Sequence, residues 1–355
     1  MIEYLQKRKS TIADYLTRYL RHECYDLLSD QRFGHDLVER LLDFTLRGKM
    51  IRGSLVFLGA ELYGHDDSDP AIVRMAAVME LLQSFLLIHD DIMDRDRLRR
   101  GSPSVYAQYD ELGKSEGICD HLHFGEAMGI CAGDVAIFLA TGLIADESVP
   151  GIYRKPLLAA VSREIVRVGI AQMGDVYHGV STQPVSETDV IDVYRFKTGR
   201  YTFSLPLICG AILAGASAED QTVLGRIGEG LGIVFQIKDD EIGLFGHADA
   251  IGKTVGSDIA ADKKTLHRIA LFERADGKTR ERMESIFGKE KPTSGDINVV
   301  LQAMHECAVP ERVSAQLHEY AQDTRSLIRE SLSGMPARGT EMLEQLLEYN
   351  LTRET

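Results

Sequence analysis

The chain has 355 residues, of which 54 are acidic and 40 basic, so its formal net charge is −14. Nucleic acids are bound by basic surfaces, so this excess of acid argues against a nucleic-acid partner. The five cysteines are dispersed without zinc spacing, which is typical of a reduced, cytoplasmic protein. The N-terminus lacks the apolar core of a signal peptide, and no run approaches ~18 uninterrupted apolar residues. We therefore expect no integral membrane segment.

Nearly every segment has the apolar spacing of an amphipathic helix. The pattern predicts helices over residues 3–29, 36–46, 47–63, 70–96, 126–146, 152–178, 186–200, 201–215 and 218–245. Three to five more are expected within residues 265–350. Residues 99–125 are expected to form a loop with a short helix, and no convincing strand is present. Since no linker or repeat interrupts the chain, residues 1–355 are expected to form a single all-α domain, a helical bundle around a central cavity.

The helix expected over residues 70–96 ends in an acidic motif, Asp90-Asp91-x-x-Asp94. Residues four apart share a helix face, so Asp90 and Asp94 point the same way, with Asp91 about 100° around the helix. Carboxylates this close repel one another. Magnesium takes oxygen ligands and commonly bridges carboxylates to phosphates, so it would remove the repulsion. Taken alone, the motif fits a solvated acidic helix end equally well.

A second acidic pair, Asp239-Asp240, ends another apolar helical stretch about 150 residues downstream. Two acidic helix ends could face each other across a cavity. Together they would hold several metal ions and a diphosphate. The second pair therefore favours the metal site over the solvated helix end.

Basic residues accompany both acidic motifs. Lys49 and Arg52 are three apart and share a helix face, while Gly48 permits close backbone approach. Arg99 and Arg100 follow the first acidic motif. Most single Lys or Arg residues are solvated surface charges, but guanidinium and ammonium groups also bind phosphate. Placed beside two acidic motifs, these residues predict phosphate binding, as does a third basic group: Lys197, Lys253 and Lys263.

Seven short motifs follow one another in order along residues 45–270: Gly48-Lys49-x-Ile51-Arg52, Asp90-Asp91-x-x-Asp94, Arg99-Arg100-Gly101-x-Pro103, Gln172-x-x-Asp175, Lys197-Thr198-Gly199, Phe235-Gln236-x-x-Asp239-Asp240, and Gly252-Lys253 through Asp258-Ile259 to Lys263. In this order and spacing they resemble the trans-isoprenyl diphosphate synthases, or polyprenyl synthetases. The resemblance implies an all-α fold of the isoprenoid synthase type, a homodimer and a requirement for Mg2+.

The resemblance also implies a role for each matching residue. Three carboxylates would bind magnesium at the diphosphate of an allylic substrate: Asp90, Asp94 and Asp239. Two would support that metal cluster: Asp91 and Asp240. Three basic residues would contact the same diphosphate: Arg99, Lys197 and Lys253. Four residues would hold the diphosphate of isopentenyl diphosphate: Lys49, Arg52, Gln83 and Arg100. Lys263 would act at a closing loop, and Thr198 and Gln236 would lie beside the reacting carbons.

These residue types suit the implied chemistry. Magnesium and basic side chains stabilise a departing diphosphate, which leaves an allylic carbocation. Attack by the double bond of isopentenyl diphosphate then forms the carbon–carbon bond, and a proton is lost, with the released diphosphate as the base. No side-chain nucleophile is required, and a dry apolar cavity protects the cation from water.

Two positions depart from the pattern of the family. Gln83 stands where many relatives have His, and its amide can still donate to phosphate. Gly243 stands at the place of the third Asp of the second acidic motif. With Asp239 and Asp240 present, metal binding is expected to survive, with a weaker third ion.

Phe85 is expected to set the product length. It lies five positions before Asp90, about one and a half helical turns below the acidic motif. A lone aromatic here, without an insertion in the first acidic motif, resembles the geranylgeranyl-type enzymes and so favours a twenty-carbon product. Ordinary core packing would explain a helix aromatic as well. By contrast, helix geometry points His89 away from Asp90 and Asp94, so we expect it to pack or hydrogen-bond rather than bind metal.

Three alternatives stay open at this point. A farnesyl or longer-chain diphosphate synthase would share the site but differ in product. A class I terpene cyclase would not need the second diphosphate site that Lys49, Arg52 and Arg100 predict. A non-catalytic partner subunit should have lost its acidic motifs, and Gly243 alone points in that direction.

Overall fold

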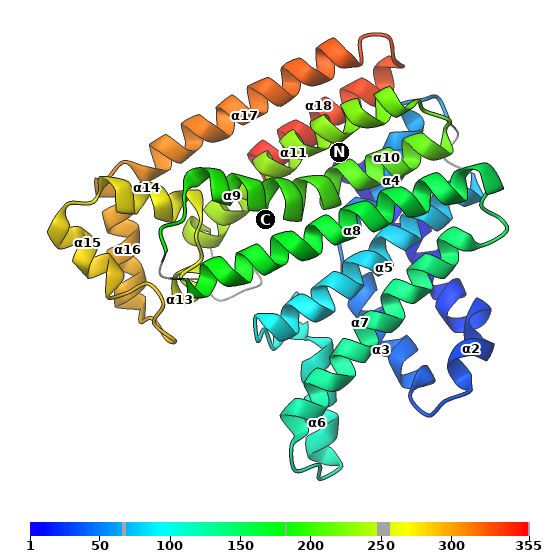
Figure 1. The fold of residues 1–355 in the computed structure, drawn as a ribbon, viewed down its shortest axis with the longest axis horizontal. Coiled ribbons are helices and arrows are strands. Elements are labelled where there is room, and N and C mark those ends of the chain that lie inside the picture. The colour runs from blue at the N-terminus through cyan, green and yellow to red at the C-terminus, as the bar shows by residue number, and fades with distance from the viewer. Residues whose placement is uncertain (66–68, 182, 247–255, 354–355) are drawn as a thin grey trace. The chain divides into compact units, whose positions relative to one another are not determined.

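The computed structural model describes residues 1–65, 69–181, 183–246 and 256–353. Its contacts divide the chain into two compact units (Figure 1). Unit 1 comprises residues 1–160 and 206–221, and unit 2 comprises residues 161–205 and 222–355. Their action as the single domain expected from the sequence stays a prediction.

Unit 1 is helical apart from one short hairpin. Its elements are α1 (Ile2–Arg18), the π-helix η1 (Tyr19–Glu23), α2 (Tyr25–Ser29), α3 (Gly34–Leu46), α4 (Ile51–Glu61), α5 (Pro70–Met93), β1 (Leu98–Arg99), β2 (Ser102–Pro103), α6 (Val105–Ser115), α7 (His121–Ala145), the first part of α8 (Gly151–Val180), and α10 (Leu205–Leu213) from its second residue onward. The buried helix α5 packs against α4 and α7, and α6 also packs against α7.

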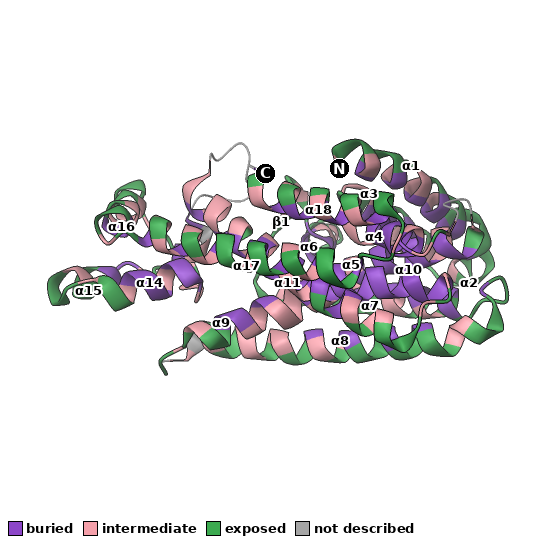
Figure 2. Cartoon of the chain, turned by 90° about the horizontal axis from the view of Figure 1, so that it is seen from above, coloured by how far each residue is buried: buried purple, intermediate pink, exposed green. Residues whose placement is uncertain are grey.

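Unit 2 is also built from helices. It contains the rest of α8, α9 (Glu187–Val193), the π-helix η2 (Tyr194–Ser204), most of α11 (Ala218–Phe245), α13 (Ser257–Ala260), α14 (Leu266–Arg274), α15 (Gly277–Glu284), α16 (Ser294–Glu306), α17 (Val309–Ser331) and α18 (Ala337–Thr352). Helix α9 continues directly into η2, and α17 packs against α14, α16 and α18. Figure 2 shows exposed residues along much of α8.

The all-α fold expected from the sequence is confirmed, with local differences. The first helix is interrupted, because the π-turn η1 separates α1 from α2. Ser186, where the sequence predicts a helix to begin, caps α9 and forms a capping box with Asp189. Helix α7 begins at His121, where the side chain of Asp120 accepts from the N–H of His123, five residues before the predicted start. The expectation of no strand is wrong at residues 98–103, where β1 and β2 form an antiparallel hairpin.

Among the described residues, two helices are long and apolar enough to cross a membrane by length and composition: α5 and α7. In α5, 67% of the most apolar window is buried within the protein, and in α7 the share is 44%. The two helices pack against each other. Such a pattern also occurs in the core helices of a folded domain, which have to be apolar on most of their faces.

Candidate active site

The first acidic motif lies at the C-terminal end of α5, in unit 1. The N–H of Asp94 closes the last turn on the carbonyl of Asp90 at 2.8 Å. Asp94 is exposed and Asp90 is half-buried, whereas the side chain of Asp91 is fully buried. The three carboxylates therefore separate into two that reach the surface and one that faces the interior, as the helical spacing predicts.

Asp91 is held by Arg99. The Nε of Arg99 donates to Oδ1 of Asp91 at 2.7 Å, and its Nη2 also contacts that oxygen. Burial raises the pKa of Asp91 to about 6, against the opposing effect of the Arg99 charge. Oδ2 of Asp91 is buried and has no hydrogen-bond partner within the described part of the chain. Asp91 thus holds the guanidinium of Arg99 beside the first acidic motif.

The hairpin β1–β2 places two arginines in different surroundings. Its turn residues, Arg100 and Gly101, both have positive φ, at 54° and 73°, the geometry of a tight hairpin turn. Arg99 points to Asp91, whereas Nη1 of Arg100 lies 3.5 Å from the carbonyl of Phe44. A Cβ on Gly48 would lie 2.9 Å from that Nη1, so the absence of a side chain lets Arg100 approach. The predicted assignment of the two arginines to different diphosphates is consistent with this separation.

Glu80 is a buried carboxylate that the sequence reasoning missed. It lies almost three turns before Asp90 on α5, and its Oε1 accepts from the backbone N–H of Gly53 at 2.7 Å. Burial raises the pKa of Glu80, opposed by the Gly53 N–H and the charges of Arg52 and Arg100. When ionised, Glu80 balances the charges of the two arginines predicted to bind isopentenyl diphosphate. The signal in the sequence was a single acid in the apolar run from residue 75 to residue 88.

The remaining residues predicted for that diphosphate also lie in unit 1. Lys49 precedes α4 and is exposed, while Arg52 in α4 and Gln83 in α5 are half-buried. Met50, between Lys49 and α4, adopts a left-handed backbone conformation with φ of 52°. This conformation is uncommon for a residue with a side chain and costs free energy, which the buried side chain of Met50 offsets by packing.

Phe85 lies on α5 below the acidic motif, as the spacing predicts. Its ring meets the ring of His89 edge-on, with the centroids 4.9 Å apart. Nε2 of His89 lies 3.1 Å from the carbonyl of Ile130 on α7. His89 therefore hydrogen-bonds and packs as expected, and its exclusion from the metal ligands stays a prediction. Its ring also packs against the ring of Phe85.

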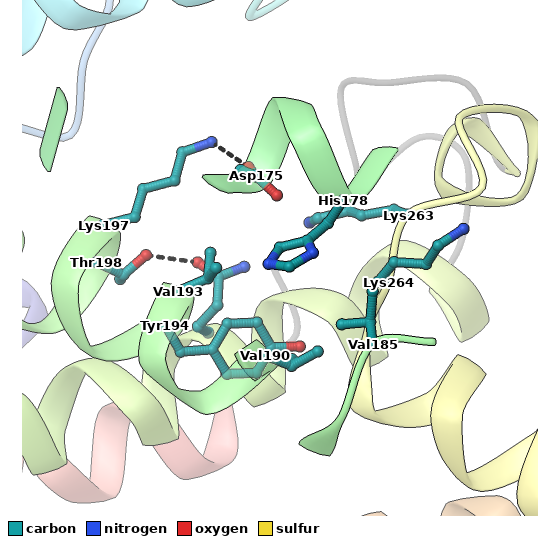
Figure 3. Close-up of a pocket in the computed structure, with 11 residues that line it drawn as sticks. Asp175, His178, Val185, Val190, Val193, Tyr194, Lys197, Thr198, Lys263 and Lys264 are labelled. Carbon is teal, nitrogen blue, oxygen red and sulfur yellow. Dashed lines mark hydrogen bonds and ion pairs between the residues drawn. The ribbon is translucent and has the colours of Figure 1, made fainter. Parts of the chain in front are cut away.

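In unit 2, a cavity of about 140 Å³ brings together four residues predicted from the sequence: Lys197, Thr198, Gln236 and Lys263 (Figure 3). Nζ of Lys197 donates to Oδ2 of Asp175 at 2.7 Å, and Oγ1 of Thr198 donates to Oε1 of Gln236 at 2.8 Å. The cavity therefore combines ammonium groups, a hydroxyl and an amide, which are suitable donors for an anion.

Asp240 lies behind this cavity and is buried. Its Oδ1 accepts from Nε2 of Gln236 at 3.1 Å and from Nζ of Lys263 at 3.0 Å, and its Oδ2 accepts from the hydroxyl of Tyr194. Burial acts to lower the pKa of Lys263, but the charges of Asp240 and Asp258 outweigh it and raise that pKa above its ordinary value. A continuous hydrogen-bonded chain thus runs from Thr198 through Gln236 to Asp240. Sequence reasoning did not single out Tyr194.

Asp239 differs from its neighbour. Its side chain is 53% exposed, whereas that of Asp240 is 1% exposed. Within the second acidic motif, Asp239 therefore is the carboxylate available to a metal ion. Gly243, one turn further on, would place a Cβ 3.4 Å from Oδ2 of Asp258. Lys253 lies outside the described residues.

The backbone around Lys197 and Thr198 is a π-helix rather than the predicted α-helix. Such wide turns are rare and frequently occur at functional sites. A Cβ on Gly232 of α11 would lie 2.1 Å from the Cα of Gly199, so η2 and α11 touch backbone to backbone. This contact brings Thr198 within hydrogen-bonding distance of Gln236.

The carboxylates fit magnesium as a resident ion. Among residues 1–65, 69–181, 183–246 and 256–353, no three His, Cys, Asp or Glu side chains are grouped closely enough to hold a metal by themselves. Magnesium typically takes one or two carboxylates, with water and substrate phosphate completing its shell. Asp90 and Asp94, and separately the half-exposed Asp239, provide oxygen donors of that kind.

Comparison with known proteins agrees with this fold. Residues 35–304 match the model of the polyprenyl synthetase family. The chain is 34% identical to a short chain isoprenyl diphosphate synthase of Methanothermobacter thermautotrophicus, over 87% of this chain and 88% of that one. It is 28% identical to a geranylfarnesyl diphosphate synthase of Aeropyrum pernix, over 86% and 90% of the two chains.

Solved structures give the same result. A geranylgeranyl pyrophosphate synthase from Corynebacterium glutamicum, complexed with isoprenyl diphosphate and magnesium, superposes with a TM-score of 0.90 at 27% identity, covering 98% of this chain and 99% of that one. The chain belongs to the polyprenyl synthetase family and is a prenyltransferase.

Proposed function

We propose that the protein condenses isopentenyl diphosphate with an allylic diphosphate, head to tail, in a magnesium-dependent reaction, and that its main product is geranylgeranyl diphosphate. The observation that carries the proposal is that the residues of the family motifs gather in two groups. In unit 1, Arg99 binds Asp91 at the end of α5, and in unit 2 Lys197, Thr198, Gln236 and Lys263 line the cavity beside η2.

We assign the binding roles as follows. Magnesium ligands are Asp90, Asp94 and Asp239, and the bound ions would neutralise the charge of the allylic diphosphate. Lys197, Arg99 and Lys253 contact that diphosphate. The diphosphate of isopentenyl diphosphate is held by Lys49, Arg52, Gln83 and Arg100. The contact of Glu80 with the start of α4 supports the orientation of Arg52.

The chemistry then needs positioned charge rather than a nucleophilic side chain. Lys197 stabilises the departing diphosphate, and its bond to Asp175 holds the ammonium in place. Thr198 and Gln236, bonded to each other, present oxygen atoms beside the allylic cation. The double bond of isopentenyl diphosphate attacks the cation, and the released diphosphate accepts the proton. Lys263 acts at the closing of the site, anchored on Asp240.

The proposed twenty-carbon length rests on Phe85. The names of the relatives cover products of different length, so they do not decide it. Because the ring of Phe85 is fixed against His89, it offers a rigid floor to a growing chain. We expect Phe85→Ala to yield products at least one isoprene unit longer, and Leu86→Ala, the adjacent control, to leave the product unchanged. Product alcohols separated by length would show this, and an unchanged spectrum for Phe85→Ala would reject the floor.

We also propose a cytoplasmic homodimer. Its support is a row of exposed apolar residues on one face of α8: Val166, Ile170, Met173 and Tyr177. Exposed apolar stripes of this kind are typical of subunit interfaces. Sedimentation velocity of the purified protein would give a dimer, and Ile170→Glu combined with Met173→Glu would give a monomer.

The activity is tested with purified protein, Mg2+, isopentenyl diphosphate and, in turn, dimethylallyl, geranyl and farnesyl diphosphates. We expect a dominant twenty-carbon alcohol after dephosphorylation. Asp90→Asn should abolish product formation, whereas Asp14→Asn, on the exposed face of α1, should not.

The outcomes separate the alternatives. A fifteen-carbon or much longer product would retain the enzyme class and reject the length. A cyclic hydrocarbon made without isopentenyl diphosphate would indicate a terpene cyclase. No product with any primer would point to a non-catalytic partner subunit, because such a subunit would bind prenyl diphosphates without joining them.

A further inference from the structure

The guanidinium of Arg353, directly after α18, lies on the second acidic motif. Its Nη2 donates to Oδ1 of Asp239 at 2.7 Å and to the carbonyl of Phe235 at 3.1 Å. The central carbon of the guanidinium lies 3.8 Å from the centroid of the Phe235 ring. The side chain of Arg353 is 6% exposed. A residue near the end of the chain therefore contacts a carboxylate assigned to metal binding.

Several contacts hold Arg353 in this position. Nδ2 of Asn350, on the last turn of α18, donates to the carbonyl of Leu231 on α11 at 3.2 Å. Phe235 itself packs against Phe203, with ring centroids 5.5 Å apart. The ring and the carbonyl of Phe235 therefore contact the guanidinium independently of Asp239.

The contact occupies one oxygen of the carboxylate. Oδ1 of Asp239 is bonded to Arg353, while the side chain as a whole is 53% exposed. Carboxylates that bind metal ions are themselves usually oriented by hydrogen bonds from neighbouring groups, which fix the direction of the remaining oxygen. The bond to Arg353 does this for Asp239, and a single carboxylate oxygen suffices for magnesium.

We propose that Arg353 is a positioning residue for metal binding: it fixes Oδ1 of Asp239 so that Oδ2 is presented to the magnesium ion. The inference rests on the proposed function, in which Asp239 is a metal ligand. It assigns a role to the end of the chain, far beyond the last sequence motif at Lys263. It also means that Arg353 stabilises the carboxylate geometry rather than competing with the ion.

The test is a metal titration of the full chain that does not depend on turnover. Mn2+ substitutes for Mg2+ and is followed by electron paramagnetic resonance, with inorganic diphosphate present. Arg353→Met keeps the length of the stem without the donors, and Arg353→Lys keeps the charge. Arg329→Met is the matched control, because Arg329 forms an exposed ion pair with Glu344 between α17 and α18.

We expect Arg353→Met to weaken Mn2+ binding about 10- to 100-fold, the range found for residues that orient metal ligands. Arg353→Lys should recover part of the loss, and Arg329→Met should bind as the unsubstituted protein does. In activity assays, the metal concentration for half-maximal rate should rise in Arg353→Met, while the rate at saturating metal stays within a few fold. Thermal unfolding without metal reports separately whether each variant is folded.

Equal or tighter Mn2+ binding by Arg353→Met would overturn the inference, and tighter binding would show competition instead. If Arg353→Met does not fold, Arg353→Lys decides alone, with unchanged affinity counting against the inference. The variant Asp239→Asn distinguishes a failure of the Arg353 inference from a failure of the proposed function. If Asp239→Asn binds Mn2+ as well as the unsubstituted protein, the metal assignment itself fails. If it loses binding while both Arg353 variants keep it, the role of Arg353 alone fails.

Discussion

Replacing Tyr194 by Phe removes one oxygen atom from the interior of unit 2. That hydroxyl donates to Oδ2 of Asp240 and lies 3.4 Å from the backbone N–H of Leu266. Both Tyr194 and Asp240 are buried. Burial and the adjacent Asp240 charge raise the pKa of Tyr194 well above its ordinary value, so the hydroxyl stays a protonated donor at neutral and mildly alkaline pH.

The expected loss of stability depends on which hydrogen bonds Asp240 keeps in the Tyr194→Phe variant. A hydrogen bond to a charged group contributes about 1.5–3 kcal/mol to stability. Gln236 and Lys263 still donate to Oδ1 in the variant, so the carboxylate is not left alone, but Oδ2 loses the Tyr194 donor. The phenyl ring keeps the packing. We therefore expect Tyr194→Phe to lower the free energy of unfolding by about 2 kcal/mol.

Urea unfolding followed by circular dichroism measures this difference. Tyr25→Phe is the control, because Tyr25 is exposed on α2, outside the proposed subunit interface, and its change should fall within about 0.5 kcal/mol. A loss below about 0.5 kcal/mol for Tyr194→Phe would refute the reasoning. A double-mutant cycle with Asp240→Asn then assigns the energy to the pair, since the Tyr194 effect should shrink once the charge is gone.

Two further substitutions test the interior of unit 2. Burial acts to raise the pKa of Glu164, but its hydrogen bonds to Arg200 (2.7 and 2.8 Å) hold that pKa below its ordinary value. The stabilisation is therefore complete above about pH 4.3 and lost as pH falls through the lowered pKa. We expect Glu164→Gln to cost about 2–3 kcal/mol at pH 7 in urea unfolding, less than a fully buried pair because Arg200 keeps Glu229. The two proteins should converge in stability only once the pH falls below the lowered pKa of Glu164. A gap independent of pH would contradict this. Gly232→Ala should lower the free energy of unfolding strongly, because its Cβ would lie 2.1 Å from Gly199. In the control Gly243→Ala the nearest atom is 3.4 Å from the new Cβ, so this variant should unfold at the same or a higher urea concentration. Equal losses of stability in the two variants would exclude the backbone contact.

The sequence predicted the helices well because their apolar spacing is a local property. It failed where local geometry depends on a few residues. Arg100 and Gly101 both need positive φ to close the hairpin, and the dipeptide is not among the usual turn pairs such as Asn-Gly. The π-helix at Lys197 depends on the close crossing of Gly199 and Gly232, which are 33 positions apart in the sequence. The spacing of apolar residues along the sequence carries no information about such a long-range backbone contact.

The site residues divide in a similar way. Motif residues such as Lys197, Gln236 and Asp239 could be named because their types and spacing carry the chemistry. Tyr194 and Arg353 could not, since an isolated Tyr or Arg has no spacing to interpret. Their significance comes from long-range contacts with the 239–240 pair that only the fold establishes. Residues that orient a motif are therefore harder to predict from sequence than residues that belong to it.

The apparent loss of an acidic residue at Gly243 is another feature that the sequence alone does not interpret correctly. In the sequence, glycine at the third position of the second acidic motif suggests that one carboxylate is missing. In the structure, Oδ2 of Asp258 lies 3.4 Å from where a Cβ of residue 243 would be. An acidic side chain from 15 positions downstream thus reaches the place of the absent one. Because electrostatic attraction for a cation depends on where charge lies rather than on which residue carries it, a missing motif residue does not by itself indicate a weaker metal site.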